Sequence, residues 1–206
     1  RLRREGASIA ASKGAKALLI RSIGTDSHRM PHTGSMRYDP DQPKIAAAAL
    51  SNPDADQLER IAARGKTPRL RLLLTPRFLG EVMSGNVIAD IRGAVSPEEV
   101  VVIGGHLDSW DLGTGAIDDG AGVAITMEVA RRIISLNKRP RRTIRLILWG
   151  AEEVGLLGGQ AYLDSRREGL KNHVIGTESD FGAGQIWRVT SRVSDQAQPI
   201  VDLISQ

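Results

Sequence analysis

The stretches His106-Leu107-Asp108-Ser109-Trp110-Asp111 and Gly115-Ala116-Ile117-Asp118-Asp119-Gly120-Ala121-Gly122 decide the fold that we predict for this chain. They follow Val100-Val101-Val102-Ile103-Gly104-Gly105, a run of residues that favours a buried strand. One imidazole and several carboxylates therefore gather where a strand ends. Nitrogen and oxygen ligands in this combination suit a divalent cation, and zinc above all.

Two further acidic clusters follow later predicted strands. The pair Glu152-Glu153 comes after the apolar run 143–149, and Glu178-Ser179-Asp180 comes after 173–177. Open α/β sheets bind ligands outside the carboxyl ends of their strands, so we expect the three clusters to converge. The residues predicted to meet at one metal site are His106, Asp118, Glu153 and Asp180.

The segments between these strands have helical patterns. Asp119 suits the N-cap of the first helix, and residues 156–167 form the second. The apolar face predicted for the first helix consists of Val123, Met127, Ala130 and Ile134. The alternation of strands and helices predicts an α/β fold with a mixed, largely parallel sheet flanked by helices.

The first part of the chain has short helices and strands of its own. We expect helices at 6–16 and 54–64 and strands at 16–21, 44–50 and 69–74, with a long loop at 22–44. Pro76 and Gly80 mark a junction to the second part. There, we also expect strands at 86–92 and 184–190, a turn at 96–99 and a helix at 198–205.

Composition narrows the possible partners and ligands. The chain has no cysteine, so any metal must be held by His, Asp and Glu. The net charge is +4, and the basic runs 1–4 and 138–145 are interpreted as solvated charge, so no nucleic-acid partner is expected. We also expect no membrane segment, since no apolar run reaches about 18 residues, and we find no signal-peptide pattern.

Two other kinds of ligand site fit the central stretch poorly. A calcium loop starting at Asp108 would need oxygen side chains where Trp110 and Leu112 stand. A dinucleotide site would need a third glycine after Gly113-Thr114-Gly115. Neither class of ligand is therefore expected.

The adjacent glutamates, Glu152 and Glu153, suggest two different roles, one as a metal ligand and one as a general base. In extended backbone, consecutive side chains point in opposite directions. One carboxylate can then bind a metal while its neighbour takes a proton from an attacking water.

The motifs His106–Asp111, Gly115–Gly120, Trp149–Glu153 and Glu178–Asp180 resemble those of the M28 family of dizinc peptidases, and within it the carboxypeptidase Q branch. The segments 17–22, 31–34 and 44–50 are similar to the protease-associated (PA-like) insert of that branch, although Ala46 replaces its usual proline. The resemblance implies a PA-like insert domain at 1–77 and an incomplete zinc peptidase catalytic domain at 78–206.

The resemblance also implies a role for each residue of the predicted site. His106 and Asp180 would bind one zinc ion, Asp118 would bridge two, and Glu153 would bind the second. Glu152 would be the general base, and Asp108 would orient His106 through its ring N–H. Asp119 and Asp111 would be structural.

One ligand of the family pattern is missing, since the family supplies a further histidine from a loop well beyond 178–180. His173 would lie roughly 23 Å from Asp180 along an extended strand, and His28 and His32 are interpreted as loop histidines. We therefore expect a piece of a longer peptidase, truncated at both ends. One of its zinc sites would be incomplete, with weak metal binding and poor hydrolysis.

The implied function is that of a metal-dependent exopeptidase acting on dipeptides or small peptides. The branch also implies a homodimer and a secreted, periplasmic or lysosomal location. The alternative is a truncated, catalytically impaired fragment that serves as a binding or interaction module.

Overall fold

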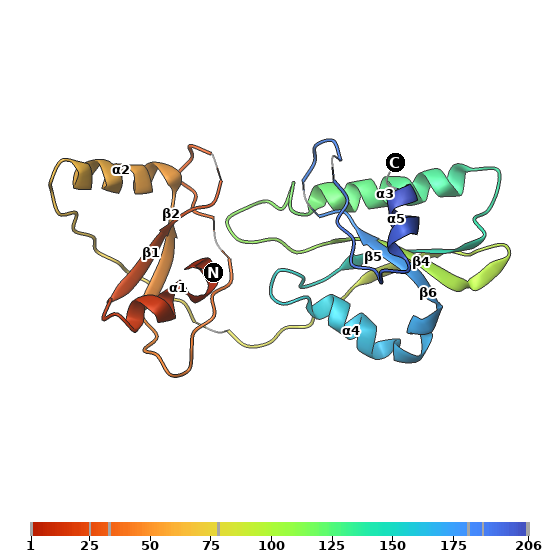
Figure 1. The fold of residues 1–206 in the computed structure, drawn as a ribbon, viewed down its shortest axis with the longest axis horizontal. Helices are drawn as coiled ribbons and strands as arrows, with labels where there is room; N and C mark the ends of the chain where they lie inside the picture. Colours follow the sequence, from red (N-terminus) through yellow and green to blue (C-terminus); the bar gives the residue numbers. More distant parts are fainter. Residues whose placement is uncertain are drawn as a thin grey trace.

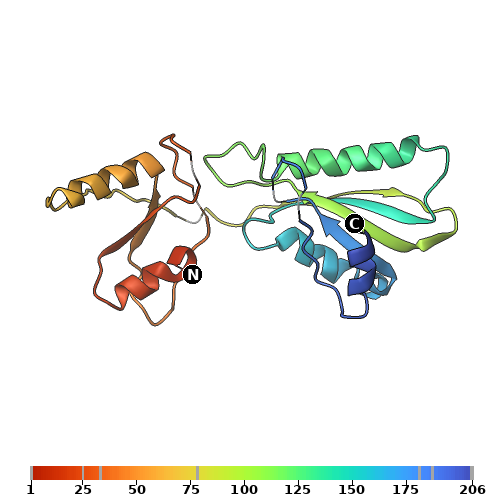
Figure 2. The same cartoon turned by 45° about the horizontal axis from the view of Figure 1, so that its top comes forward.

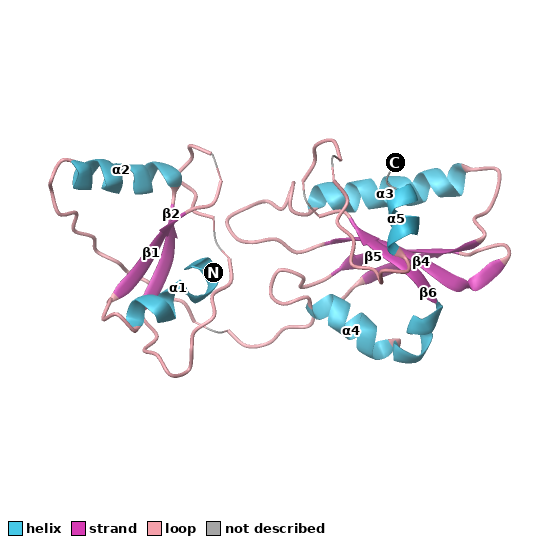
Figure 3. Ribbon diagram, viewed as in Figure 1, coloured by secondary structure: helices cyan, strands magenta, loops and turns pink. Residues whose placement is uncertain are grey.

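The computed structural model describes residues 2–24, 26–32, 34–77, 79–180, 182–186 and 188–204. Its helices and strands form two groups, one around a two-stranded sheet and one around a four-stranded sheet (Figures 1 and 3). Among the described residues, no helix is both long enough and apolar enough to cross a membrane.

The first group contains residues up to the end of the second helix. Its elements are α1 (Leu2–Ala11), β1 (Ala17–Arg21), β2 (Ala46–Leu50) and α2 (Asn52–Ala63). The two strands pair in parallel, and α1 and α2 lie on opposite sides of them (Figures 1 and 2). Ser51 caps α2 by accepting the Asp54 N–H. Pro53 lies in the first turn of the helix, where a main-chain N–H has no partner within the helix, so its absence in proline costs no hydrogen bond. The assignment of this group as a PA-like insert stays a prediction.

The second group is built on a four-stranded sheet. Its strands are β3 (Val87–Ile91), β4 (Ser96–His106), β5 (Arg142–Trp149) and β6 (His173–Glu178), in the order β3-β5-β4-β6. The central strand β4 is parallel to β5 and β6, whereas β3 is antiparallel to β5. The predicted mixed, largely parallel sheet is thus confirmed.

Helices cover both faces of this sheet. The helix α3 (Gly120–Ser135) lies on one face and α4 (Leu157–Ser165) on the other (Figures 1 and 2), followed by a 3-10 helix (Arg167–Asn172) and by α5 (Gln198–Ile204). One cluster of buried core residues consists of Val100, Val102, Ile147 and Tyr162, and Leu146 and Leu148 of β5 are buried as well. The aliphatic strand residues thus fix the sheet, and the polar residues that follow them project from its edge.

Close contact between α3 and the end of the sheet requires glycine. A Cβ atom on Gly122 would lie 1.8 Å from the carbonyl oxygen of Ser179, and one on Gly105 would lie 2.7 Å from Oδ2 of Asp119. The hydroxyl of Thr126 donates to the carbonyl of Gly104 at 2.9 Å and completes this contact. The close approach brings Asp118, just before α3, to the ends of β4 and β6.

This packing predicts that Gly122→Ala is destabilising. The added methyl group meets main chain, which must shift, and overpacking of this kind costs about 1–3 kcal/mol. Thermal unfolding should show a melting temperature lower by several degrees. The matched control is Gly159→Ala in α4, where the added Cβ meets nothing within 4 Å. Equal melting temperatures for the two variants would contradict the proposed contact.

The buried face of α3 differs from the predicted one. Val123 and Ala130 are half-buried as expected, but Met127 and Ile134 are exposed (54% and 67%), whereas Gly122 and Thr126 are buried. The prediction was wrong for Met127 and Ile134 because it followed apolar periodicity, while the helix packs through small residues that permit close approach.

Several predicted boundaries were also wrong. Residues 69–74 form no strand, and their leucines are exposed. An alternating pattern of residues does not by itself provide a partner strand. The described residues of 184–190 form no strand either. Residues 96–99 belong to β4, which tolerates Pro97 near its start before an irregularity in the pairing. The first helix lies earlier than expected, at Leu2–Ala11, and the chain turns at Gly14, whose φ is +82°.

Candidate metal centre

The end of β4 holds His106 in a fixed orientation. The side chain is 1% exposed, and its main-chain N–H donates to Oδ2 of Asp119 at 2.9 Å. Its ring Nδ1 lies 2.9 Å from the carbonyl oxygen of Asp108. A hydrogen bond at Nδ1 leaves Nε2 as the ligand atom, as is usual for a metal-bound histidine.

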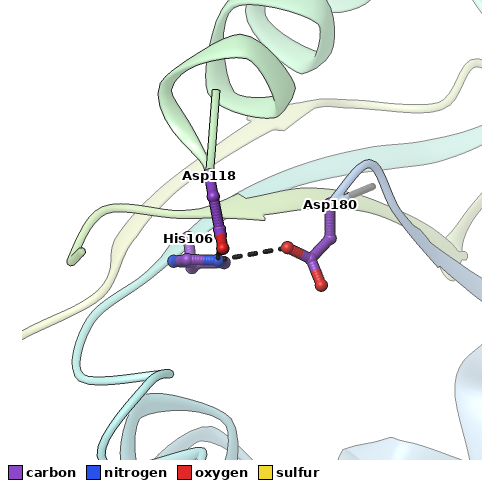
Figure 4. A group of neighbouring side chains, drawn as sticks. All are labelled: His106, Asp118 and Asp180. Carbon is purple, nitrogen blue, oxygen red and sulfur yellow. Dashed lines mark hydrogen bonds and ion pairs between the residues drawn. The ribbon is translucent and has the colours of Figure 1, made fainter. Parts of the chain in front are cut away.

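Two carboxylates converge on that Nε2 atom. Oδ1 of Asp118 lies 3.1 Å and Oδ1 of Asp180 3.3 Å from it (Figure 4). One ligand atom from each of these three residues can be chosen so that all lie within 4.8 Å of one another. Within the described part of the chain, no other group of three or more His, Asp and Glu residues meets this condition.

The residues fit a zinc ion. Two ligands of a tetrahedral zinc, each about 2.0–2.1 Å from the ion, lie roughly 3.3 Å apart. The separations of Asp118 and Asp180 from Nε2 of His106, 3.1 and 3.3 Å, are close to that value. One imidazole nitrogen and two carboxylate oxygens are also a ligand set that leaves a coordination position for water.

Burial and charge act in opposite directions on His106. Burial lowers the pKa of its imidazole. The hydrogen bond with the Asp108 carbonyl and the charges of Asp119, Asp180 and Glu152 together outweigh burial, so the pKa is raised. The site therefore favours a positive charge at this position, whether a proton or a bound cation.

The neighbouring glutamates experience the same crowding of negative charge. Burial is the largest cause that raises the pKa of Glu152, Glu153 and Glu178, and neighbouring carboxylates raise it further. A divalent cation would relieve this repulsion. Glu178 was part of a predicted cluster but had no predicted role; it is exposed at the end of β6, and the carboxylates of Asp180, Glu152 and Asp119 contribute to its raised pKa.

These shifts predict how zinc affinity depends on pH. Zinc needs a neutral imidazole, so it competes with the proton that His106 binds more tightly than an ordinary histidine. Below the raised pKa, affinity should fall about tenfold per pH unit for each proton displaced. Calorimetric titration between about pH 8 and 5 measures this slope. The control His173→Gln should not change the profile, and an affinity independent of pH would contradict the assignment.

Asp119 has the structural role that was predicted for it. Its carboxylate accepts the N–H groups of Gly122 and His106, and it is 2% exposed. It thus caps α3 and holds the end of β4 at the same time.

Asp108 contacts the ring of His106 through its main-chain carbonyl, not through its carboxylate. The carbonyl oxygen is 2.9 Å from the ring, while the nearest carboxylate oxygen is 3.7 Å away. The carboxylate instead accepts the main-chain N–H groups of Glu152 and Glu153, at 2.8 and 3.1 Å. Asp108 therefore positions the glutamate pair as well as the imidazole.

The glutamate pair does not lie in extended backbone. Both of its N–H groups point to one carboxylate, and Ala151 before it has a φ of 54°. Glu153 lies outside the group of close ligand atoms, and its Oε2 accepts the indole N–H of Trp110 at 2.5 Å. The structure thus brings together three of the four predicted ligands. The role of Trp110 was missed, although it lies within the decisive motif.

The prediction that His173 is an ordinary strand residue is confirmed. It begins β6, at the opposite end from Asp180, and its Nε2 lies 2.8 Å from the hydroxyl of Tyr162.

The fold and the site together define a class of protein. The model of Peptidase family M28 matches residues 86–196, which include all of the predicted ligands and more than half of the chain. This chain belongs to peptidase family M28.

Individual relatives narrow the resemblance. The chain is 40% identical to carboxypeptidase Q of Bos taurus over 97% of its own length and 42% of the relative, and 41% identical to that of Homo sapiens over 87% and 38%. A crystal structure of a peptidase M28 precursor from Shewanella amazonensis SB2B is 47% identical, with a TM-score of 0.84, over 99% of this chain and 46% of that one. The chain thus spans about two fifths of the length of these curated relatives.

Proposed function

We propose that the chain is part of a zinc-dependent exopeptidase that hydrolyses dipeptides or small peptides. The observation that carries this proposal is the convergence of His106, Asp118 and Asp180 next to Glu152. Membership of peptidase family M28 and the similarity to carboxypeptidase Q support it. In this proposal residues 78–206 form the catalytic unit and 1–77 a PA-like insert.

The three converging residues would hold one zinc ion, and Asp118 with Glu153 would hold a second. Bound zinc would lower the pKa of a water molecule and polarise the peptide carbonyl. The remaining steps belong to side chains of the chain itself, and they depend on how Glu152 is placed and charged.

Glu152 would act as the general base. Its carboxylate accepts a proton from the attacking water and returns it to the leaving amine. The raised pKa of Glu152 brings its proton affinity closer to neutral pH, where a base can both take and release a proton. Asp108 fixes the main chain of Glu152 and so limits how far its carboxylate can move.

The partners and the location are also part of the proposal. We propose a peptide substrate with a free terminus, a homodimer, and a secreted, periplasmic or lysosomal setting. Membership of peptidase family M28 and the similarity to carboxypeptidase Q support the peptide substrate.

A second candidate function rests on Glu153. Its carboxylate is engaged by Trp110 and is separate from the close ligand group, which leaves the second metal position with few ligands. In this alternative the chain is a catalytically impaired fragment that binds zinc and peptides without turnover.

Dipeptide hydrolysis with and without zinc distinguishes the two functions. The exopeptidase proposal predicts turnover that a chelator abolishes and added zinc restores. Zinc binding with no turnover would favour the binding module, and an absence of zinc binding at neutral pH would contradict both.

A further inference from the structure

A pocket of about 370 Å³ lies between the two groups of elements, next to the candidate metal centre. One wall is residues 109–118 with Glu153, and the other includes His28, Met30, Pro31 and His32 of the first group. The loops that carry these walls approach each other in both views (Figures 1 and 2). Asp118 belongs both to this pocket and to the metal centre, so the two are continuous.

The wall from the first group is held in place by buried polar residues. Ser22, 7% exposed, accepts the main-chain N–H of His32 at 2.7 Å. Asn52, 3% exposed, donates to the carbonyls of Gly24 and Asp26 at 3.1 and 3.2 Å. The main chain on either side of Met30 is thus anchored before any ligand binds.

The opposite wall is anchored in a similar way. The indole of Trp110 donates to Glu153, and the carbonyl of Trp110 accepts the N–H of Gly113 at 3.0 Å. The N–H of Gly120 donates to the carbonyl of Gly115 at 2.7 Å, which closes the loop before α3. Both walls therefore present fixed surfaces, as ligand pockets usually do.

The chemistry of the lining favours an apolar ligand group. Several of its polar side chains already have partners: Asp26 lies 3.2 Å from His28, and Glu153 binds Trp110. Apolar side chains remain partly exposed on both walls. They are Met30 (47%), Leu112 (60%) and Ile117 (62%). An apolar group in the pocket would cover them and remove that surface from water.

We propose that this pocket binds the apolar side chain of the substrate residue next to the scissile bond, and that Met30 is a specificity-determining residue. The inference rests on the proposed function, because that function places the scissile bond at Asp118 and Glu152. A volume of about 370 Å³ is near the lower end for small-molecule pockets, which suits a dipeptide with a leucine-sized side chain.

The test compares leucine with alanine in both positions of a dipeptide. We expect the zinc-loaded protein to prefer Leu-Gly over Ala-Gly, or Gly-Leu over Gly-Ala, by about 10- to 200-fold in kcat/KM. Met30→Ala should reduce that preference about tenfold, with little change for the alanine peptides. Met30→Leu should retain it. The control is Met127→Ala, which removes a similarly exposed methionine on α3 (54%, against 47% for Met30).

A binding measurement separates this proposal from the proposed function. Calorimetric titration of the zinc-loaded Glu152→Gln protein with the same dipeptides needs no turnover. If no form hydrolyses peptides, but leucine peptides bind more tightly than alanine peptides and lose that advantage in Met30→Ala, the pocket assignment stands and the proposed function fails. Equal binding of leucine and alanine peptides, or an unchanged preference in Met30→Ala, overturns the pocket assignment.

Discussion

Replacing Glu152 with glutamine should abolish the peptide hydrolysis of this chain and leave its zinc content nearly unchanged. A positioned general base contributes about 10²–10⁴-fold to the rate, and the amide of glutamine cannot accept the proton. The substitution keeps the size of the side chain and the main-chain contact with Asp108. The predicted zinc ligands are other residues, so metal analysis of the variant should match that of the unaltered protein.

The control for this result is Glu168→Gln, an exposed glutamate in the 3-10 helix that precedes β6, at the opposite end of that strand from Asp180. It should leave both turnover and zinc content unchanged. If Glu152→Gln lost zinc in proportion to its activity, Glu152 would be a ligand and the assigned division between base and ligands would be incorrect.

Removing one of the three converging ligands should weaken zinc binding strongly. The free energy of zinc binding at structural sites with four ligands is roughly 10–16 kcal/mol. Divided among the ligands, this is about 3 kcal/mol for each, or about 100-fold in affinity. Asp180→Ala should lower zinc affinity by that order. Asp180 is only partly buried, and the loss of its carboxylate should relieve the repulsion that raises the pKa of Glu152 and Glu178.

The matched control is Asp164→Ala, which removes an aspartate on α4 that pairs with Arg167. Calorimetric zinc titration should give the unaltered affinity for this control. Equal affinities for the Asp180 and Asp164 variants would show that Asp180 is no ligand.

The convergence of the site could be predicted from sequence because it follows from strand order. His106, Glu152 and Asp180 each come near the end of a strand, and parallel strands bring those ends to one edge. The N-cap at Asp119 could be predicted for a different, local reason, since it depends only on the residues that follow it.

Contacts that depend on tertiary structure could not be predicted. The Asp108 carboxylate accepts hydrogen bonds from the main-chain N–H groups of Glu152 and Glu153, which requires the turn that follows Ala151. Ala151 has a positive φ, which its residue type does not suggest. The buried face of α3 depends on how closely Gly122 approaches Ser179. Apolar periodicity carries no information on that distance.

Zinc anomalous diffraction from crystals of the zinc-loaded protein tests the central claim most directly. The proposal predicts an anomalous peak bound by Nε2 of His106 and by carboxylate oxygens of Asp118 and Asp180, at about 2.0–2.2 Å from each. Zinc bound at other residues, or a fully loaded protein with no peak between these three side chains, would contradict it.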